Sequence, residues 1–172
     1  MDKQKTISSE VSFSGIGIHT GEKSNITLKP LKENSGIIFK RIDLDEPIYI
    51  EAILENVVST NRGTVIGKKN VKIHTIEHLL SALYALEIDN LLIEIDNIEP
   101  PILDGSSKIF FNTILNCGLI KQIADKDYYK ISEPIHYYDH NSDIILKILP
   151  SEEFSVTFES DFPYKSIGKQ KF

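Results

Sequence analysis

Alternating apolar and polar residues fill much of the first half of the chain and predict short, half-buried strands. The alternation runs through residues 6–13 and recurs over residues 24–28, 36–40 and 48–53. A short apolar run at residues 90–96 is typical of a buried strand. Together these segments predict a β-sheet.

Two stretches follow the helical period instead. In residues 75–86 the apolar side chains recur at i, i+3, i+4 and i+7, and Thr75 is the expected N-cap. Residues 107–116 carry a second apolar stripe, and Gly118 stands where a helix commonly ends. The chain is therefore expected to combine strands with two helices.

The pattern changes after about residue 120. Residues 122–127 are polar and are expected to form a link. Strand-like runs follow, with no helix after them, at residues 128–131, 144–149 and 154–158. Strands without a covering layer do not close a core. We therefore expect one complete N-terminal α+β domain at residues 1–124 and the opening strands of a second domain at residues 125–172.

Composition and charge argue against several classes of protein. With 172 residues, 41% of them hydrophobic, the chain can bury the core of one ordinary domain or two small ones. A net charge of −6 without a Lys/Arg cluster disfavours a nucleic-acid partner or an anionic membrane surface. No apolar run reaches a membrane span of roughly 18 residues and no signal peptide is visible, so a cytoplasmic location is expected. The single Cys117 excludes an internal disulfide framework and a Cys-based zinc knuckle.

Three glycines in seven residues mark residues 15–21, Gly-Ile-Gly-Ile-His-Thr-Gly, as a turn with unusual dihedral angles. The spacing superficially matches a dinucleotide-binding fingerprint. That fingerprint needs a helix directly after it to hold the pyrophosphate, whereas a strand is predicted here. A glycine-built hairpin is therefore favoured, and His19 at its tip is either a surface residue or part of a site.

The sharpest chemical signal is the H-x-x-E-H pattern formed by His74, Glu77 and His78, which matches inverted zinc metallopeptidases. In that chemistry both histidines bind zinc and a downstream glutamate, such as Glu152 or Glu153, completes the site. Both histidines would have to lie on the helix. The predicted cap follows His74 directly, which leaves His74 outside the helix and weakens the peptidase interpretation.

A structural alternative is a helix histidine beside an exposed glutamate. Against it, Glu77 and His78 lie opposite the leucine stripe, and His78 shares its face with Ser81, Ala82 and Ala85. Solvated helix faces usually carry more charge. This face is therefore expected to abut another element or to line a cleft.

The run of residues 101–106, Pro-Ile-Leu-Asp-Gly-Ser, leads into the second predicted helix. A tight turn that builds the helix entry is the simpler interpretation. Asp104 could instead orient a histidine from behind.

Several of these segments occur together in one known family. In order and spacing they resemble the zinc-dependent UDP-3-O-acyl-N-acetylglucosamine deacetylases of lipid A biosynthesis. Further similarity at both ends of the chain extends the resemblance over nearly all 172 residues. The main matching segments are residues 15–21, 75–83, 88–90 and 101–106.

The resemblance implies a fold and a reaction. The family fold has two similar α+β domains, each a sheet layered on two helices, with the active site between them. The reaction removes acetate from the 2-amino group of a UDP-linked, 3-O-acylated glucosamine. Glu77 matches the general base that activates the zinc-bound water, and His78 matches the first Zn²⁺ ligand.

Four further residues match substrate-binding positions of the family. His19 and Ile18 border the substrate site, Thr60 begins the segment that lines the acyl passage, and Phe162 packs on the uracil. The resemblance places the other two zinc ligands in a His-Lys-x-x-Asp motif beyond residue 172. We therefore expect an N-terminal part that is inactive alone and needs a fused or separate C-terminal half.

Some relatives in this family carry a fused 3-hydroxyacyl dehydratase.

Two other functions remain open for this chain. One is the metallopeptidase, and the other is a non-catalytic binding module whose UDP-sugar or partner binding would be indifferent to changes at Glu77 and His78.

Overall fold

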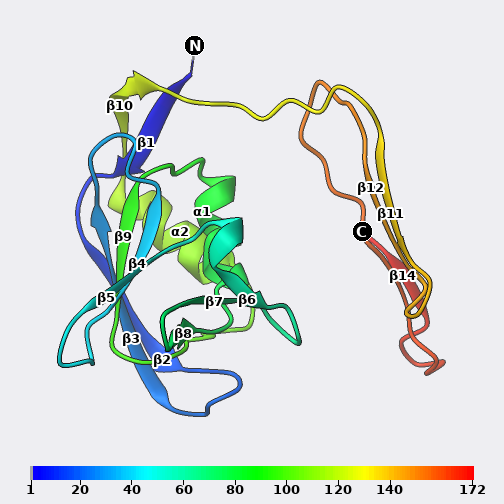
Figure 1. Cartoon of the computed structure of the whole chain (residues 1–172), viewed down its shortest axis with the longest axis horizontal. Helices are drawn as coiled ribbons and strands as arrows, with labels where there is room; N and C mark the ends of the chain where they lie inside the picture. The colour runs from blue at the N-terminus through cyan, green and yellow to red at the C-terminus, as the bar shows by residue number, and fades with distance from the viewer. Residues whose placement is uncertain (1) are drawn as a thin grey trace. The chain divides into compact units, whose positions relative to one another are not determined.

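The computed structural model describes residues 2–172. The chain divides into two compact units, Met1–Lys126 and Asp127–Phe172. The first unit contains both helices and the larger sheets, and the second contains two short hairpins (Figure 1).

A five-stranded sheet is the centre of the first unit, with strand order β2-β3-β9-β4-β5. Strands β4 and β9 run parallel, and the other neighbouring pairs run antiparallel. The strand predicted at residues 90–96 is β9 and occupies the middle of this sheet, as its apolar sequence indicated. The bounds are β2 Val11–Ile16, β3 Lys23–Pro30, β4 Ile37–Arg41, β5 Ile48–Glu51 and β9 Leu91–Ile95.

The two faces of the sheet differ in polarity because side chains alternate along each strand. Leu28 on β3 and Ile93 on β9 are fully buried in the core. On the other face, Glu94 of β9 forms ion pairs with Lys29 at 2.9 Å and Lys40 at 2.7 Å. Only the apolar face therefore needs a covering layer.

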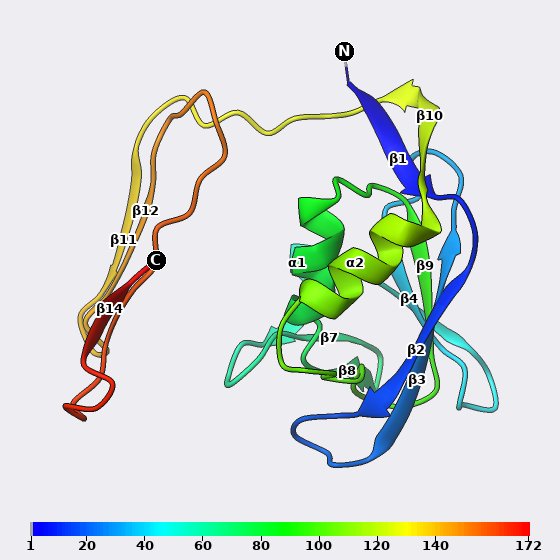
Figure 2. The same ribbon diagram turned by 180° about the vertical axis from the view of Figure 1, so that it is seen from behind.

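Two helices, α1 (Glu77–Ala85) and α2 (Lys108–Cys117), supply that layer on one side of the sheet (Figure 2). Leu83 of α1 and Phe110 of α2 are buried in the same core as the sheet residues. The Phe110 ring meets the Phe13 ring edge to face, with centroids 4.9 Å apart. The unit is a two-layer α+β domain, which confirms the fold class expected from the sequence.

Two smaller sheets complete the first unit. Strand β1 (Lys3–Ile7) pairs antiparallel with β10 (Leu119–Asp125). A short 3-10 helix, Leu54–Asn56, precedes a three-stranded sheet. The strands of that sheet are β6 Val57–Ser59, β7 Val65–Lys68 and β8 Val71–Ile73.

Two sequence predictions fail in this region. Residues 6–13 were expected to form one strand, but the chain breaks after Ile7 and β2 starts at Val11. Residues 122–127 were expected to form a link, but most of them belong to β10. Their polar side chains are compatible with a strand because β10 pairs with β1 alone and leaves much of its surface exposed, while Gln122 hydrogen-bonds to Asn90 and to the Leu31 carbonyl.

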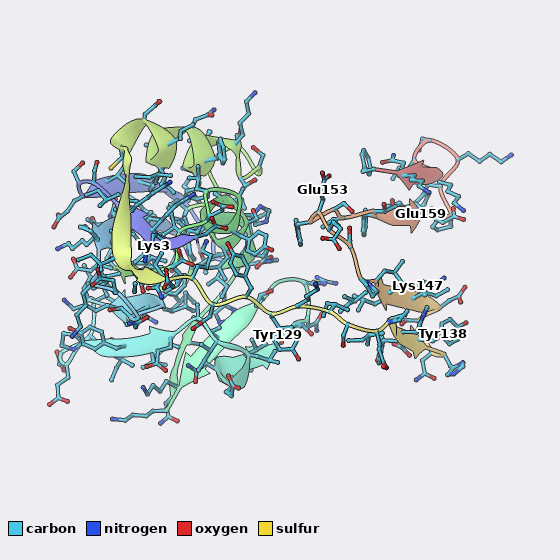
Figure 3. The ribbon with its side chains drawn as sticks, turned by 90° about the horizontal axis from the view of Figure 1, so that it is seen from above. Lys3, Tyr129, Tyr138, Lys147, Glu153 and Glu159 are labelled. Atoms are coloured by element: carbon cyan, nitrogen blue, oxygen red, sulfur yellow. The ribbon has the colours of Figure 1, made fainter. Side chains whose placement is uncertain are left out.

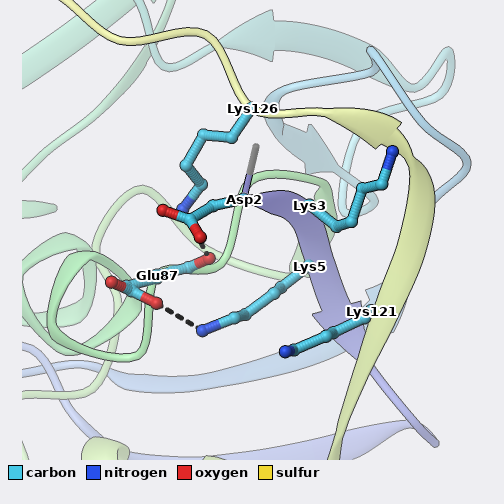
Figure 4. A pocket seen from close by; sticks show the side chains of 6 residues that line it. All are labelled: Asp2, Lys3, Lys5, Glu87, Lys121 and Lys126. Carbon is cyan, nitrogen blue, oxygen red and sulfur yellow. Dashed lines mark hydrogen bonds and ion pairs between the residues drawn. The ribbon is translucent and has the colours of Figure 1, made fainter.

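A lysine-rich hollow lies where β1 and β10 approach the end of α1 (Figure 4). Three of its four lysines are paired. Lys3 pairs with Asp125 at 2.6 Å and joins β1 to β10, Lys5 pairs with Glu87 after α1, and Lys126 pairs with Asp89 at 3.3 Å. The lining residues are Asp2, Lys3, Lys5, Glu87, Lys121 and Lys126.

The second unit consists of strands alone, as the sequence indicated. Strand β11 (Ile135–Asp139) pairs with β12 (Ile144–Ile148); Figure 3 labels Tyr138 on the first and Lys147 on the second. The Tyr138 hydroxyl donates a hydrogen bond to Asp143. Strand β13 (Glu159–Asp161) pairs with β14 (Lys169–Lys171).

The predicted strand at residues 144–149 is therefore confirmed. The strands predicted at residues 128–131 and 154–158 are wrong, since both runs are irregular. Apolar alternation alone does not form a strand where no partner strand lies beside it. Across residues 2–172, no helix is long and apolar enough to cross a membrane.

Candidate active site

Glu77 and His78 are the first two residues of α1, and both are partly exposed. Thr75 was expected to cap this helix, but Ile76 occupies the N-cap position without a side-chain cap bond. Thr75 instead adopts a positive φ of 53°, and its hydroxyl donates a hydrogen bond to Glu99 at 2.7 Å. The hydroxyl is therefore turned away from the helix that it was expected to cap.

The face of α1 that carries His78 is mostly exposed, whereas the sequence predicted that it abuts another element or lines a cleft. Ser81 and Ala85 are exposed, and the Ser81 hydroxyl bonds to the His78 carbonyl at 3.0 Å. Of the residues on this face, Ala82 meets the expectation, because it is buried together with Leu83 in the core. The small side chain at position 82 thus serves helix packing.

The loop that joins β6 to β7 lies against the Glu77 carboxylate. The Thr64 N–H donates a hydrogen bond to Glu77 Oε2 at 2.9 Å. A Cβ added to Gly63 would lie 3.3 Å from Glu77 Oε1. Residue 63 thus closely approaches the carboxylate, and the loop backbone fixes the direction in which Glu77 points.

His19 reaches the same loop from the turn between β2 and β3. Its Nε2 lies 3.1 Å from the Arg62 carbonyl oxygen, within hydrogen-bond distance. Residues 62–64 therefore contact both His19 and Glu77. The structure brings these two predicted site residues to opposite ends of one short backbone segment.

The other predicted substrate-binding residues are less enclosed. Ile18 is 57% exposed beside His19. Thr60 is exposed at the start of the loop, and the residue of that loop that bonds to Glu77 is Thr64. Phe162 belongs to the second unit, where it is 48% exposed and its N–H donates to the Gly168 carbonyl at 3.1 Å.

His74 does not share a helix with His78. It precedes α1, and its N–H donates a hydrogen bond to the Ile98 carbonyl at 2.8 Å. Although the two histidines are four residues apart in sequence, they therefore lack the shared helix face that the metallopeptidase motif requires. Within residues 2–172, no group of three His, Cys, Asp or Glu side chains could hold a metal ion.

The hydrogen bonds of the Asp104 side chain stay within its own turn. Its Oδ1 accepts bonds from the Ser106 N–H at 3.0 Å and the Ser106 hydroxyl at 2.9 Å. The Ser106 N–H bond in particular lowers the pKa of the Asp104 carboxyl. These contacts support the simpler interpretation, in which Asp104 builds the entry to α2.

Sequence reasoning missed Glu99, which is only 1% exposed. Its carboxylate accepts hydrogen bonds from the His19 N–H at 3.1 Å, the Thr20 N–H at 3.0 Å and the Thr20 hydroxyl at 3.1 Å. The Thr75 hydroxyl supplies the bond already described. A glutamate directly before two prolines at the end of a buried strand was the available signal.

The charge on Glu99 is stabilised by these donors. Burial acts to raise the pKa of the carboxyl, but the bonds from Thr75, Thr20 and His19 together outweigh it. The pKa of Glu99 therefore lies below its usual value. Glu99 is a buried anion held by neutral donors.

Glu99 also explains the glycine-rich motif. A Cβ on Gly17 would overlap Glu99 Oε2 and the Thr20 hydroxyl, and a Cβ on Gly15 would lie 2.9 Å from Pro101 Cβ. The glycines admit the segment of residues 99–101. A strand, β3, follows the turn, so the hairpin interpretation is confirmed and the pyrophosphate-binding geometry is missing.

Comparison of the sequence with known proteins identifies a family. The sequence model of the LpxC family, described as UDP-3-O-acyl N-acetylglycosamine deacetylase, matches residues 4–172. A UDP-3-O-acyl-N-acetylglucosamine deacetylase of Wolinella succinogenes is 44% identical over 170 residues, which cover 99% of this chain and 56% of the relative. A bifunctional enzyme LpxC/FabZ of Porphyromonas gingivalis is 44% identical over 170 residues, which cover 99% of this chain and 37% of the relative.

A bifunctional enzyme LpxC/FabZ of Chlorobaculum tepidum is 41% identical over 167 residues, which cover 97% of this chain and 36% of the relative. The chain thus spans 36% to 56% of the length of these three relatives. By name, the relatives are deacetylases or bifunctional enzymes that include one. The chain belongs to the LpxC family of UDP-3-O-acyl-N-acetylglucosamine deacetylases, which confirms the resemblance found in its sequence.

Proposed function

We propose that this chain supplies the general base and one metal ligand of a zinc-dependent N-deacetylase. The substrate is UDP-3-O-acyl-N-acetylglucosamine, and the reaction releases acetate on the route to lipid A. The observation that carries the proposal is the Glu77–His78 pair at the start of α1, in a chain of the LpxC family. A cytoplasmic location goes with this proposal.

Glu77 acts as the general base in this proposal. The Thr64 N–H engages Oε2, while none of the hydrogen bonds found within residues 2–172 engages Oε1. Oε1 is therefore available to accept a proton from the attacking water. The fixed Oε2 contact restricts rotation of the carboxylate, so the base is directed before substrate arrives.

His78 provides one ligand of the metal. A catalytic zinc site requires three protein ligands and an open position, and the described residues do not form such a group. The two remaining ligands are assigned to sequence that these 172 residues do not include. When bound, zinc lowers the pKa of its water ligand to about 7.

The substrate contacts follow from the same assignment. His19 and Ile18 border the substrate site, Thr60 begins the segment that lines the acyl passage, and Phe162 packs on the uracil. Support for His19 comes from its contact with the loop that also bonds to Glu77. A C-terminal half, fused or separate, completes the enzyme.

A chimera tests this proposal. Residues 1–172 replace the matching part of the Wolinella succinogenes deacetylase, and acetate release from the acylated UDP-sugar is measured with zinc present. We expect turnover by the chimera, none by the 172-residue chain, and loss of turnover in the chimera with Glu77→Ala. Turnover by a folded chimera that is unchanged in Glu77→Ala would refute the role of Glu77.

Turnover by the 172-residue chain alone would refute the need for a second half. A matched control is Glu87→Ala, since Glu87 lies just after the other end of α1 and pairs with Lys5 at the surface. We expect that variant to retain the activity of the chimera. The non-catalytic alternative predicts instead a chimera that binds the UDP-sugar without turnover.

A further inference from the structure

Glu99 is the most enclosed acidic side chain near the candidate site. It follows β9 by four residues and lies outside every motif that the sequence suggested. Its four donors come from three residues on two separate segments: His19 and Thr20 in the turn after β2, and Thr75 before α1. One carboxylate therefore joins the two segments that carry His19 and Glu77.

The backbone on the helix side is held in an unusual conformation. Thr75 is β-branched and has a φ of 53°, which is a rare and unfavourable combination. Its hydroxyl bond to Glu99, together with the bond from the His74 N–H to the Ile98 carbonyl, fixes this segment. Strained residues persist where surrounding contacts determine them. Glu77 lies two residues further along.

The turn on the other side has been shaped around the carboxylate. Gly17 has no side chain where Glu99 Oε2 lies, and the N–H groups of His19 and Thr20 both point at the carboxylate. With its main chain fixed in this way, the His19 ring meets the Arg62 carbonyl.

These contacts form a closed path. It runs from Glu99 through His19 to residues 62–64, from the Thr64 N–H to Glu77, and back through Thr75 to Glu99. Removing one of these residues would loosen the side chains of both His19 and Glu77.

We propose that Glu99 is a positioning residue of the site. It fixes the positions of His19 and the start of α1 relative to each other, on either side of residues 62–64. It acts through His19 and Thr75 and does not itself touch substrate. Its importance for catalysis rests on the deacetylase function proposed above, whereas its effect on His19 does not.

The ionised carboxylate suits this task better than an amide. Two oxygens accept from all four donors at once. In Glu99→Gln the charge is removed and one oxygen becomes an NH₂ group. With that group facing the Thr75 hydroxyl, which can also accept, the bonds from His19 and Thr20 to the remaining oxygen lose their charge assistance. The substitution keeps the side-chain volume and therefore separates the hydrogen bonds from packing.

Nuclear magnetic resonance of the full 172-residue chain tests the proposal without substrate or metal. In Glu99→Gln we expect the His19 and Thr20 amides to exchange with solvent at least about tenfold faster, as loss of a charge-assisted bond implies. We also expect the His19 imidazole signals and the amides of residues 62–64 to shift. The matched control is Glu94→Gln, which removes a carboxylate of β9 that bonds to Lys29 and Lys40.

The proposal is overturned if Glu99→Gln alters Thr20 and Thr75 but leaves the His19 ring and residues 62–64 unchanged. It is also overturned if Glu94→Gln produces the same shifts at His19. Should Glu99→Gln not fold, Thr20→Val removes one hydroxyl donor and must still move the His19 imidazole signals. Failure of the chimera to turn over would leave these results unaffected, so the two proposals are tested separately.

Discussion

Replacing Gly17 by alanine tests whether the glycine-rich turn exists to admit Glu99. The added Cβ would overlap Glu99 Oε2 and lie 3.0 Å from Glu99 Cδ, whereas ordinary contact begins at 3.4 Å. Gly17 is not among the described glycines with positive φ. The cost therefore arises from contacts with the carboxylate and with the Thr20 hydroxyl that binds it, and not from backbone strain.

Two terms set the size of the effect. Overpacking a filled site costs about 1–3 kcal/mol. Moving the carboxylate away also weakens its bonds with the N–H groups of His19 and Thr20, and a bond to a charged group is worth about 1.5–3 kcal/mol. With only part of that bonding lost, we expect Gly17→Ala to lower the free energy of unfolding by about 2–5 kcal/mol.

Urea unfolding followed by far-ultraviolet circular dichroism measures this loss. Both helices lie in the first unit, so the helical signal reports that unit alone. The control is Gly36→Ala, where φ is 72° and nothing lies within 4 Å, so that only a backbone cost of about 1–2 kcal/mol is expected. If Gly17→Ala costs no more than Gly36→Ala, the turn is not shaped by Glu99.

Three further predictions concern stability. Phe110→Ala should lower the free energy of unfolding by about 3–5 kcal/mol in urea, because Phe110 fills the core between sheet and helices. The lowered pKa of Glu99 implies stabilisation that is complete above its usual value of about 4.3 and is lost as pH falls through the folded-state pKa. The free energy of unfolding, measured by urea denaturation at pH values from 6 to 3, should therefore fall less steeply with decreasing pH in Glu99→Gln than in the unsubstituted chain. An equal dependence on pH in both proteins would contradict this. Lys5→Ala should cost less than about 0.5 kcal/mol at low salt, since the Glu87 partner is exposed, and nothing measurable in 1 M salt.

Periodicity identified the elements that build the core. The leucine stripe of α1 is buried or partly buried as predicted, and the apolar run at residues 91–95 is the central strand β9. In α2, Phe110 and Ile114 are buried as predicted, but Ile109 and Leu115, which were also expected to face inward, are 39% and 47% exposed. These patterns are reliable because burial of one face decides them locally. The family motifs likewise pointed to Glu77, His78 and His19 from the order of residues alone.

What the sequence could not provide were contacts between distant segments. Glu99 bonds to Thr75, which is 24 positions away in sequence, and to Thr20, which is 79 positions away. No local sequence pattern indicates such pairs. Thr75 was expected to cap α1 because its spacing is right, but a distant carboxylate takes its hydroxyl. Strand β10 was overlooked because its partner β1 lies at the other end of the domain. Tertiary partners decided each case.

Zinc binding tests the central claim most directly. A calorimetric titration compares the metal-free 172-residue chain, the Wolinella succinogenes chimera and the chimera with His78→Ala. We expect weak or absent binding by the chain alone, and one tight site in the chimera that His78→Ala removes. Tight one-to-one binding by the chain alone, or a chimera site indifferent to His78→Ala, would contradict it.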